Sequence, residues 1–168
     1  MVGGTVLLAR RNDPGGSGAG GEQMRRIGQA VAGHGFEARW AATEADARAV
    51  LRTEAGLAAA LVAWDLPGST AVLREIGRRF TGLPVLLVMA DGADEELDAL
   101  PLWVAETVSG YVWPLEDTPA FIAGRIAAAA RTYRETLLPW WRRRTATAPS
   151  SCSPWASPRA SGARCWTP

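Results

Sequence analysis

The fold of this chain is decided by one stretch, Leu57-Ala58-Ala59-Ala60-Leu61-Val62-Ala63-Trp64-Asp65-Leu66-Pro67-Gly68. An apolar run that ends in an acid and a Pro-Gly turn is typical of a strand buried on both faces, in the middle of a parallel sheet. A second such run, 83–90, follows after one helix-length segment. Together the two runs predict a doubly wound α/β unit, whose functional groups normally lie at the carboxyl ends of the strands.

The remaining segments add further strands and helices around this centre. Strands are expected at 5–9, 36–41, from residue 57, at 84–89 and at 109–114. Helices are expected at 22–33, from the N-cap Thr43 to about residue 55, and from the N-cap Ser69 to about residue 80. A fourth helix is expected from the acidic segment 91–96 to Val108, with a break or kink at Pro101. A fifth is expected from Asp117 onward, and its buried face should carry Phe121, Ile122, Ile126, Ala129 and Tyr133. The pattern predicts a receiver/flavodoxin-like fold, in which a five-stranded parallel sheet has helices on both faces.

Composition divides the 168 residues into a body and a tail. Residues 1–135 hold 13 Arg and 17 acidic residues, a net charge of −4, whereas residues 136–168 hold five Arg and no acid, a net charge of +5. We therefore expect one domain at 1–135, the start of a linker at 136–141 and a low-complexity tail at 142–168. The tail has no aliphatic residue larger than Ala, so it cannot offset its ordering entropy by burial, and we predict that it is disordered.

A basic tail with Trp residues is one way to bind RNA or a membrane surface. The same amino-acid composition results when GC-rich DNA is translated in a wrong reading frame. We favour that explanation, so neither nucleic acid nor membrane is expected as a partner.

Absent residue types exclude several chemistries. All 18 basic residues are Arg, so no lysine can form a Schiff base with pyridoxal phosphate or serve a Walker P-loop. The cysteines, Cys152 and Cys165, both lie in the tail, and with the single His34 they are too few for a structural zinc site. The N-terminus does not read as a signal peptide and no stretch is long enough to span a bilayer, so a cytoplasmic location is expected.

Residues 16–21 match the dinucleotide-binding pattern G-x-G-x-x-G between a strand and a helix. However, six residues, 10–15, separate the expected strand from the motif, where a dinucleotide site needs an immediate tight turn. A flexible glycine loop is the favoured interpretation, and a small nucleotide-binding protein remains as a third alternative.

Asp65 stands at the end of the central strand, where a response-regulator receiver carries its phosphoacceptor. A receiver also needs an acid pair after its first strand for Mg²⁺, a Thr or Ser ending the fourth strand and a Lys ending the fifth. The corresponding candidates are Asn12-Asp13, Ala90 and Trp113-Pro114. Phosphotransfer is therefore expected to fail, and Asp65 is interpreted as a turn or capping residue at a degenerate receiver position.

Three segments, Leu-Pro-Val at 83–85, Asp-Thr-Pro-Ala-Phe-Ile-Ala at 117–123 and Tyr-Arg-Glu-Thr-Leu-Leu-Pro at 133–139, carry a resemblance. In their order and spacing, residues 4–139 resemble the N-terminal receiver-like wing domain of the ornithine/lysine/arginine decarboxylases. The resemblance implies fold-type I pyridoxal-phosphate enzymes as the parent family, with the cofactor lysine in a catalytic domain that would follow. Nothing in the chain past Pro139 resembles that domain, so we expect a truncated or frameshifted reading frame.

The resemblance implies a non-catalytic module that helps decarboxylase subunits dimerise and stack into rings. No cofactor and no activity are expected of this chain by itself, and its expected partners are a second copy or decarboxylase subunits. In some family members the wing region is implied in binding a nucleotide alarmone, but no residue here can be assigned to that role. The alternative function is a degenerate receiver-like signalling adaptor that binds a partner protein through a helix face.

Overall fold

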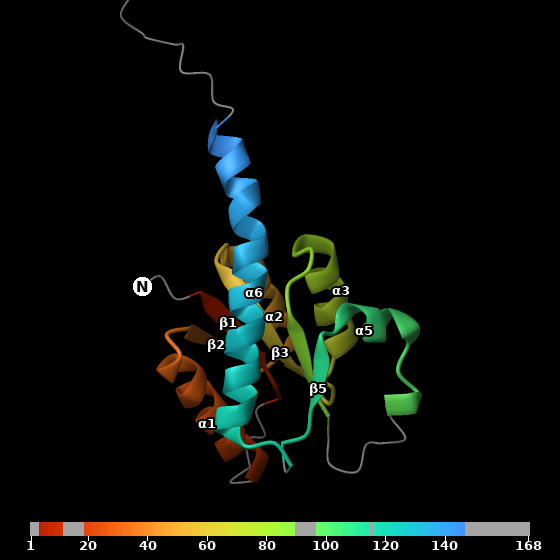
Figure 1. The fold of residues 1–168 in the computed structure, drawn as a ribbon. Coiled ribbons are helices and arrows are strands. Elements are labelled where there is room, and N and C mark those ends of the chain that lie inside the picture. The colour runs from red at the N-terminus through yellow and green to blue at the C-terminus, as the bar shows by residue number, and fades with distance from the viewer. Residues whose placement is uncertain (1–3, 12–18, 90–96, 115, 147–168) are drawn as a thin grey trace, which may run out of the picture.

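The computed structural model describes residues 4–11, 19–89, 97–114 and 116–146, with the backbone alone for 19–21 and 138–146. Its centre is a parallel sheet with the strand order β2-β1-β3-β4-β5 (Figure 1). The strands are β1 (Thr5–Ala9), β2 (Glu37–Ala41), β3 (Leu57–Ala63), β4 (Val85–Val88) and β5 (Gly110–Val112). The helices are α1 (Ala19–Gly33), α2 (Glu44–Thr53), α3 (Ser69–Arg79), α5 (Leu102–Thr107) and α6 (Pro119–Ala146). This is the order of a flavodoxin-like sheet, and it confirms the predicted fold class.

The central strands are buried because they have no polar face. Every residue of β1, β3 and β4 is buried, and β3 lies between β1 and β4. The predicted double burial of the 57–63 run is therefore confirmed. The two edge strands, β2 and β5, are more exposed, as the alternation of 36–41 indicated.

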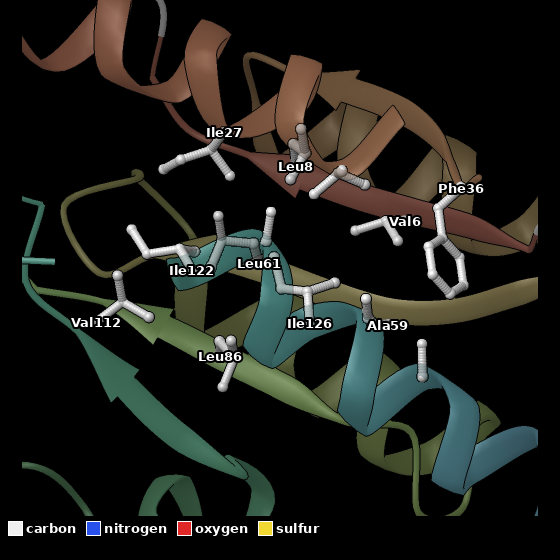
Figure 2. Close-up of a cluster of buried hydrophobic side chains, with 14 of the residues drawn as sticks. Val6, Leu8, Ile27, Phe36, Ala59, Leu61, Leu86, Val112, Ile122 and Ile126 are labelled. Atoms are coloured by element: carbon white, nitrogen blue, oxygen red, sulfur yellow. The ribbon is translucent and has the colours of Figure 1, made fainter. Parts of the chain in front are cut away.

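The helices form one hydrophobic core on each face of the sheet. On one face, Ile27 of α1 and Ile122 and Ile126 of α6 pack over Val6, Leu8 and Leu61 (Figure 2). On the other face, α2, α3 and α5 contribute Leu51, Leu73 and Val104. Alternate residues of β1 and β3 point into opposite cores, which is why these strands are apolar at successive positions.

Local signals in the sequence place several helix ends. Thr43 is the N-cap of α2, with its Oγ1 accepting from the Asp46 backbone N–H at 3.1 Å. The break expected at Pro101 is confirmed, since α5 begins at Leu102. His34 is exposed just past the end of α1, as predicted, and Gly35 beside it has a φ of 83°.

Other expectations were wrong in detail. Helix α1 begins at Ala19 rather than residue 22, so the last positions of the 16–21 glycine motif belong to its first turn, while residues 12–18 lie outside the described residues. Gly68, not Ser69, is the N-cap of α3, and Ser69 is buried as its first residue. Phe121 is 55% exposed because Ile122 and Ala123, not Phe121, meet the sheet.

Helix α6 is long and only partly packed. Its buried residues end at Ala130, while its backbone continues through 136–141 to Ala146 and projects past the sheet (Figure 1). The stretch that was expected to be linker is thus helical, as are the first residues of the expected tail, whereas 147–168 and both cysteines lie outside the described residues. Among the described helices, none is both long and apolar enough to cross a membrane.

Candidate functional site

The carboxyl edge of the sheet is the first place to look for a site. Asp65 follows β3 in an exposed turn, and its carboxylate forms no hydrogen bond or ion pair with any described residue. The expected capping role is thus absent in the described part of the chain, while the expected position in a turn is observed. Among the described residues, no charged side chain is bonded to this carboxylate to hold a metal ion or a phosphoryl group beside it.

The turn that carries Asp65 is fixed from two sides. The Ser69 hydroxyl, although buried, donates to the Trp64 carbonyl at 3.1 Å. Gly68 has a φ of 83°, and the Glu44 carboxylate lies where its Cβ would be. Glu44 is held there by the Arg48 guanidinium at 3.2 Å. The turn is therefore packed against the start of α2.

The other receiver positions do not complete a phosphotransfer site. Asn12-Asp13 and Ala90 lie outside the described residues, and the end of β5 presents Trp113, half-buried, and Pro114 in place of a lysine. Within the described ranges, no cluster of three or more His, Cys, Asp or Glu side chains could hold a metal ion. Asp65 as a degenerate receiver position stays a prediction.

A pocket of about 430 Å³ lies between the start of α1 and the loop from β5 to α6. Three acids, Glu22, Glu116 and Asp117, line it together with Arg26. Hydrogen bonds from Arg25 and then Arg26 hold the pKa of Glu22 at about 2, so its carboxylate is charged. Because acids outnumber the guanidinium, the described wall of this pocket repels phosphate rather than attracting it. It gives no support to a nucleotide at the glycine-rich segment.

The β5 edge of the sheet is closed by side chains. The Val112 carbonyl accepts from the Met89 N–H at 3.0 Å, so Tyr111 points its backbone groups away from β4. Arg125 Nη1 donates to the Tyr111 carbonyl at 2.9 Å, and the Asp117 carboxylate accepts from the Trp113 N–H at 3.2 Å. Two α6-side residues therefore occupy hydrogen-bonding groups that an added strand would use.

Arg125 reaches the strand because β5 begins with glycine. A Cβ atom on Gly110 would be 2.7 Å from Arg125 Nη2. The Arg125 guanidinium also lies 5.9 Å from the centre of the Phe121 ring, which is the exposed aromatic of α6. No local sequence pattern identifies this closure, since it joins residues from separate elements.

The β2 edge is open. The Glu37 N–H donates to the Gly4 carbonyl and the Ala41 carbonyl accepts from the Arg10 N–H, both at 3.0 Å, so alternate residues of β2 face β1. The backbone N–H and C=O groups of Ala38 and Trp40 point away from β1, and no hydrogen bond from the described part of the chain reaches them. The two edges of the sheet therefore differ in whether the described residues bond their outward backbone groups.

Comparison with known proteins gives the context for these surfaces. Residues 19–133 match the family described as the Orn/Lys/Arg decarboxylase N-terminal domain. The chain belongs to this family. The matched segment runs from α1 to the packed part of α6 and includes every strand of the sheet except β1.

Curated relatives show the same relationship. The domain is 30% identical to lysine decarboxylase LdcA of Pseudomonas aeruginosa over 127 residues, which are 71% of this chain and 17% of that protein. It is 37% identical to the biodegradative arginine decarboxylase of Escherichia coli over 68 residues, 40% of this chain and 9% of that protein. The chain thus spans less than a fifth of the length of these relatives.

Solved structures show the fold. The lysine decarboxylase LdcF of Francisella novicida superposes with a TM-score of 0.64 at 10% identity, covering 79% of this chain and 18% of that one. A CheY-like receiver domain of Methanospirillum hungatei gives 0.63 at 15% identity, covering 80% and 99%. Similarity at this level establishes a receiver-like fold, as predicted.

Pyridoxal phosphate, which the resemblance implied for the parent family, does not fit this chain. The full sequence contains no lysine to hold the cofactor covalently. In the described residues, the pocket at the start of α1 is lined by three acids and one arginine, which disfavours the cofactor's phosphate. We therefore derive no catalytic step for the decarboxylase N-terminal domain.

Proposed function

We propose that this chain is a non-catalytic wing module of an Orn/Lys/Arg decarboxylase-type protein, which acts in the cytoplasm by holding subunits together. The observation that carries the proposal is the family match over 19–133, which covers the packed body apart from β1, in a chain without lysine. Under this proposal, decarboxylation belongs to a pyridoxal-phosphate domain elsewhere in the assembly. The contribution of this chain is made through its surface.

The surface has features suited to that role. Helix α6 projects from the body, and Leu137 near the end of its described side chains is 39% exposed. Phe121, at the other end of the same helix, is 55% exposed, and Leu102 of α5 is 75% exposed. Under this proposal, these three apolar side chains are the ones that contact with another subunit would cover.

Co-elution tests this proposal. The full chain is mixed with a full-length lysine or arginine decarboxylase homologue and separated by size exclusion with light scattering. We expect the chain to move with the decarboxylase, whereas a receiver domain of similar fold serves as the matched control and elutes alone. We also expect no decarboxylation of lysine, arginine or ornithine by the chain with added pyridoxal phosphate. Failure to co-elute with decarboxylase subunits would overturn the assignment.

A second candidate, a degenerate receiver-like signalling adaptor, is favoured by one specific likeness. The fold superposes, with a TM-score of 0.56 at 17% identity, on an atypical orphan response regulator whose structure is described as revealing a phosphorylation-independent regulatory mechanism. An adaptor of this kind would need no phosphoacceptor chemistry. Capture of a histidine kinase or a transcription factor, and not of a decarboxylase, would favour it over the wing module.

A further inference from the structure

We propose that β2 is the self-association edge of this domain, and that a second copy adds its own β2 antiparallel to it so that the two sheets become continuous. This inference rests on the proposed function, because it names the partner and the surface of the wing module. The starting observation is the difference between the two edges. Arg125 bonds the outward Tyr111 carbonyl and Asp117 bonds the outward Trp113 N–H at the β5 edge, whereas none of the outward groups of Ala38 and Trp40 has a partner among the described residues.

The charges of β2 select one register for the pair. Glu37 and Arg39 are both exposed, lie on the same face and form an ion pair of 2.9 Å with each other. If Ala38 of one copy stands opposite Ala38 of the second, each Glu37 stands opposite an Arg39. These are non-hydrogen-bonded pairs, in which opposed side chains come closest. A shift that places Arg39 opposite Arg39 would set like charges together.

The same register pairs most of the outward backbone groups and covers the apolar face. Ala38 exchanges N–H···O bonds with Ala38 of the second copy, and each Trp40 N–H reaches the Phe36 carbonyl of the other chain. Phe36 keeps its own N–H in a 3.4 Å bond to the Val31 carbonyl, so the Trp40 carbonyl gains no donor and each end of the pair has a single bond. Trp40, 50% exposed, comes to lie opposite Phe36 and loses water-exposed surface. One alignment therefore matches hydrogen bonds, charges and apolar groups at once.

The size of the contact sets its strength. A five-residue strand buries far less than the roughly 1,600 Å² of a standard stable interface. The dimer of the isolated chain is therefore weak and depends on concentration. Within an assembly that already holds two wings close together, the same contact forms at a much higher effective concentration.

Sedimentation of the full chain over a wide concentration range tests the pairing. Wild type should pass from monomer to dimer. Ala38→Pro removes an outward N–H that the monomer does not use, a change that edge strands tolerate, and it should abolish the dimer while the circular dichroism stays native. Wild type that stays monomeric at every concentration, or an Ala38→Pro dimer, would overturn the proposal.

A charge exchange tests the register. Arg39→Glu and Glu37→Arg each place like charges opposite one another, and each should weaken its own dimer by about tenfold or more. An equal mixture of the two variants restores both opposite pairs and should dimerise again, which a merely misfolded variant would not do. Arg78→Glu, an exposed charge reversal on α3, is the matched control and should dimerise as wild type. A mixture that stays monomeric overturns this register.

The result is separable from the fate of the wing assignment. Co-elution with a decarboxylase is measured on the same Ala38→Pro chain. If Ala38→Pro co-elutes with the decarboxylase and still self-associates as wild type does, the wing joins subunits through another surface. This result overturns the edge pairing alone. Loss of self-association with no co-elution by wild type supports the edge pairing and overturns the wing function.

Discussion

The indole of Trp40 lies directly over Gly28 of α1. A Cβ atom on Gly28 would be 2.5 Å from Trp40 Cζ2 and 3.3 Å from Leu8 Cδ1. A glycine in the middle of a helix costs about 1 kcal/mol relative to alanine, so this position gives up helix stability to seat the aromatic ring. The contact fixes the half-exposed Trp40 on the outer strand of the sheet.

Gly28→Ala should therefore destabilise the domain. Overpacking against the indole costs about 1–3 kcal/mol, which exceeds the gain of about 1 kcal/mol in helix propensity. Gly124→Ala on α6 is the control, since nothing lies within 4 Å of its added Cβ, and it should be neutral or slightly stabilising. Urea denaturation measures both free energies of unfolding. Equal effects of the two substitutions would contradict the close Trp40 contact.

Gly68→Ala should be more damaging than Gly35→Ala, although both residues have a φ of 83°. Each substitution forces a left-handed conformation on alanine, at about 1–2 kcal/mol. Only the Gly68 Cβ also meets the Glu44 side chain, because nothing lies within 4 Å of Gly35. Adding Glu44→Ala should recover the excess cost of Gly68→Ala in thermal melts. An excess that persists in the double variant would exclude Glu44 as its cause.

Glu22 should titrate far below an ordinary glutamate. Hydrogen bonds from Arg25 and Arg26 lower the pKa of Glu22 from 4.5 to about 2. Because the folded-state pKa is the depressed one, the stabilisation is complete above pH 4.5 and is lost as the pH falls toward 2. Carbon NMR of the side-chain carboxyl measures this pKa directly. Salt should raise it, since the cluster is exposed, and an unshifted Glu22 would show that the pair does not persist in solution.

Arg125→Met should expose the β5 edge. The variant loses the bond to the Tyr111 carbonyl, at a cost of about 1 kcal/mol, and keeps an aliphatic side chain of similar length. With that carbonyl free, we expect stronger self-association by light scattering than in wild type. Arg131→Met, an exposed change on the same helix, provides the comparison. Identical scattering from both variants would mean that Arg125 does not protect the edge.

Asp65 should not accept a phosphoryl group. With acetyl phosphate and Mg²⁺, the intact mass of the chain should stay constant, while a receiver domain treated in parallel gains one phosphoryl group. The physical reason is the exposed carboxylate, which has no charged neighbour among the described residues, in a chain that lacks lysine. A mass increase that Asp65→Asn removes would restore a phosphorelay function.

Burial on both faces made the centre of the fold readable from sequence. The runs at 57–63 and 85–88 have no polar alternate residue, and only a covered sheet accommodates that. The buried face of α6 was harder to predict, because Phe121 and Ile122 are adjacent and periodicity alone does not say which of them meets the sheet. Contact with the sheet selects Ile122 and Ile126, and Phe121 is left at the surface. The start of α1 was missed because Gly20 and Gly21 are weak helix formers.

The edge chemistry was beyond the reach of local patterns. Asp117 was recognised as a helix-start residue, but its bond to the Trp113 N–H depends on how the loop folds back. The sequence does not distinguish Arg125 from an ordinary solvated charge, because its bond to β5 depends on how α6 packs beside that strand. The alternation of 37–40 did indicate an exposed strand, yet only the hydrogen bonds of Glu37 and Ala41 to the chain beside them show which backbone groups of β2 remain outward.

The closure of β5 by Arg125 limits how far this domain can polymerise. A parallel sheet with two free borders could add copies without end and grow into a fibre. With the Tyr111 carbonyl and the Trp113 N–H of the β5 border already bonded within the chain, two copies that meet through β2 as proposed offer a poorer border for a third copy, which favours a symmetric pair. Under the proposed pairing, the bond from Arg125 to the Tyr111 carbonyl therefore favours a closed pair over a growing fibre.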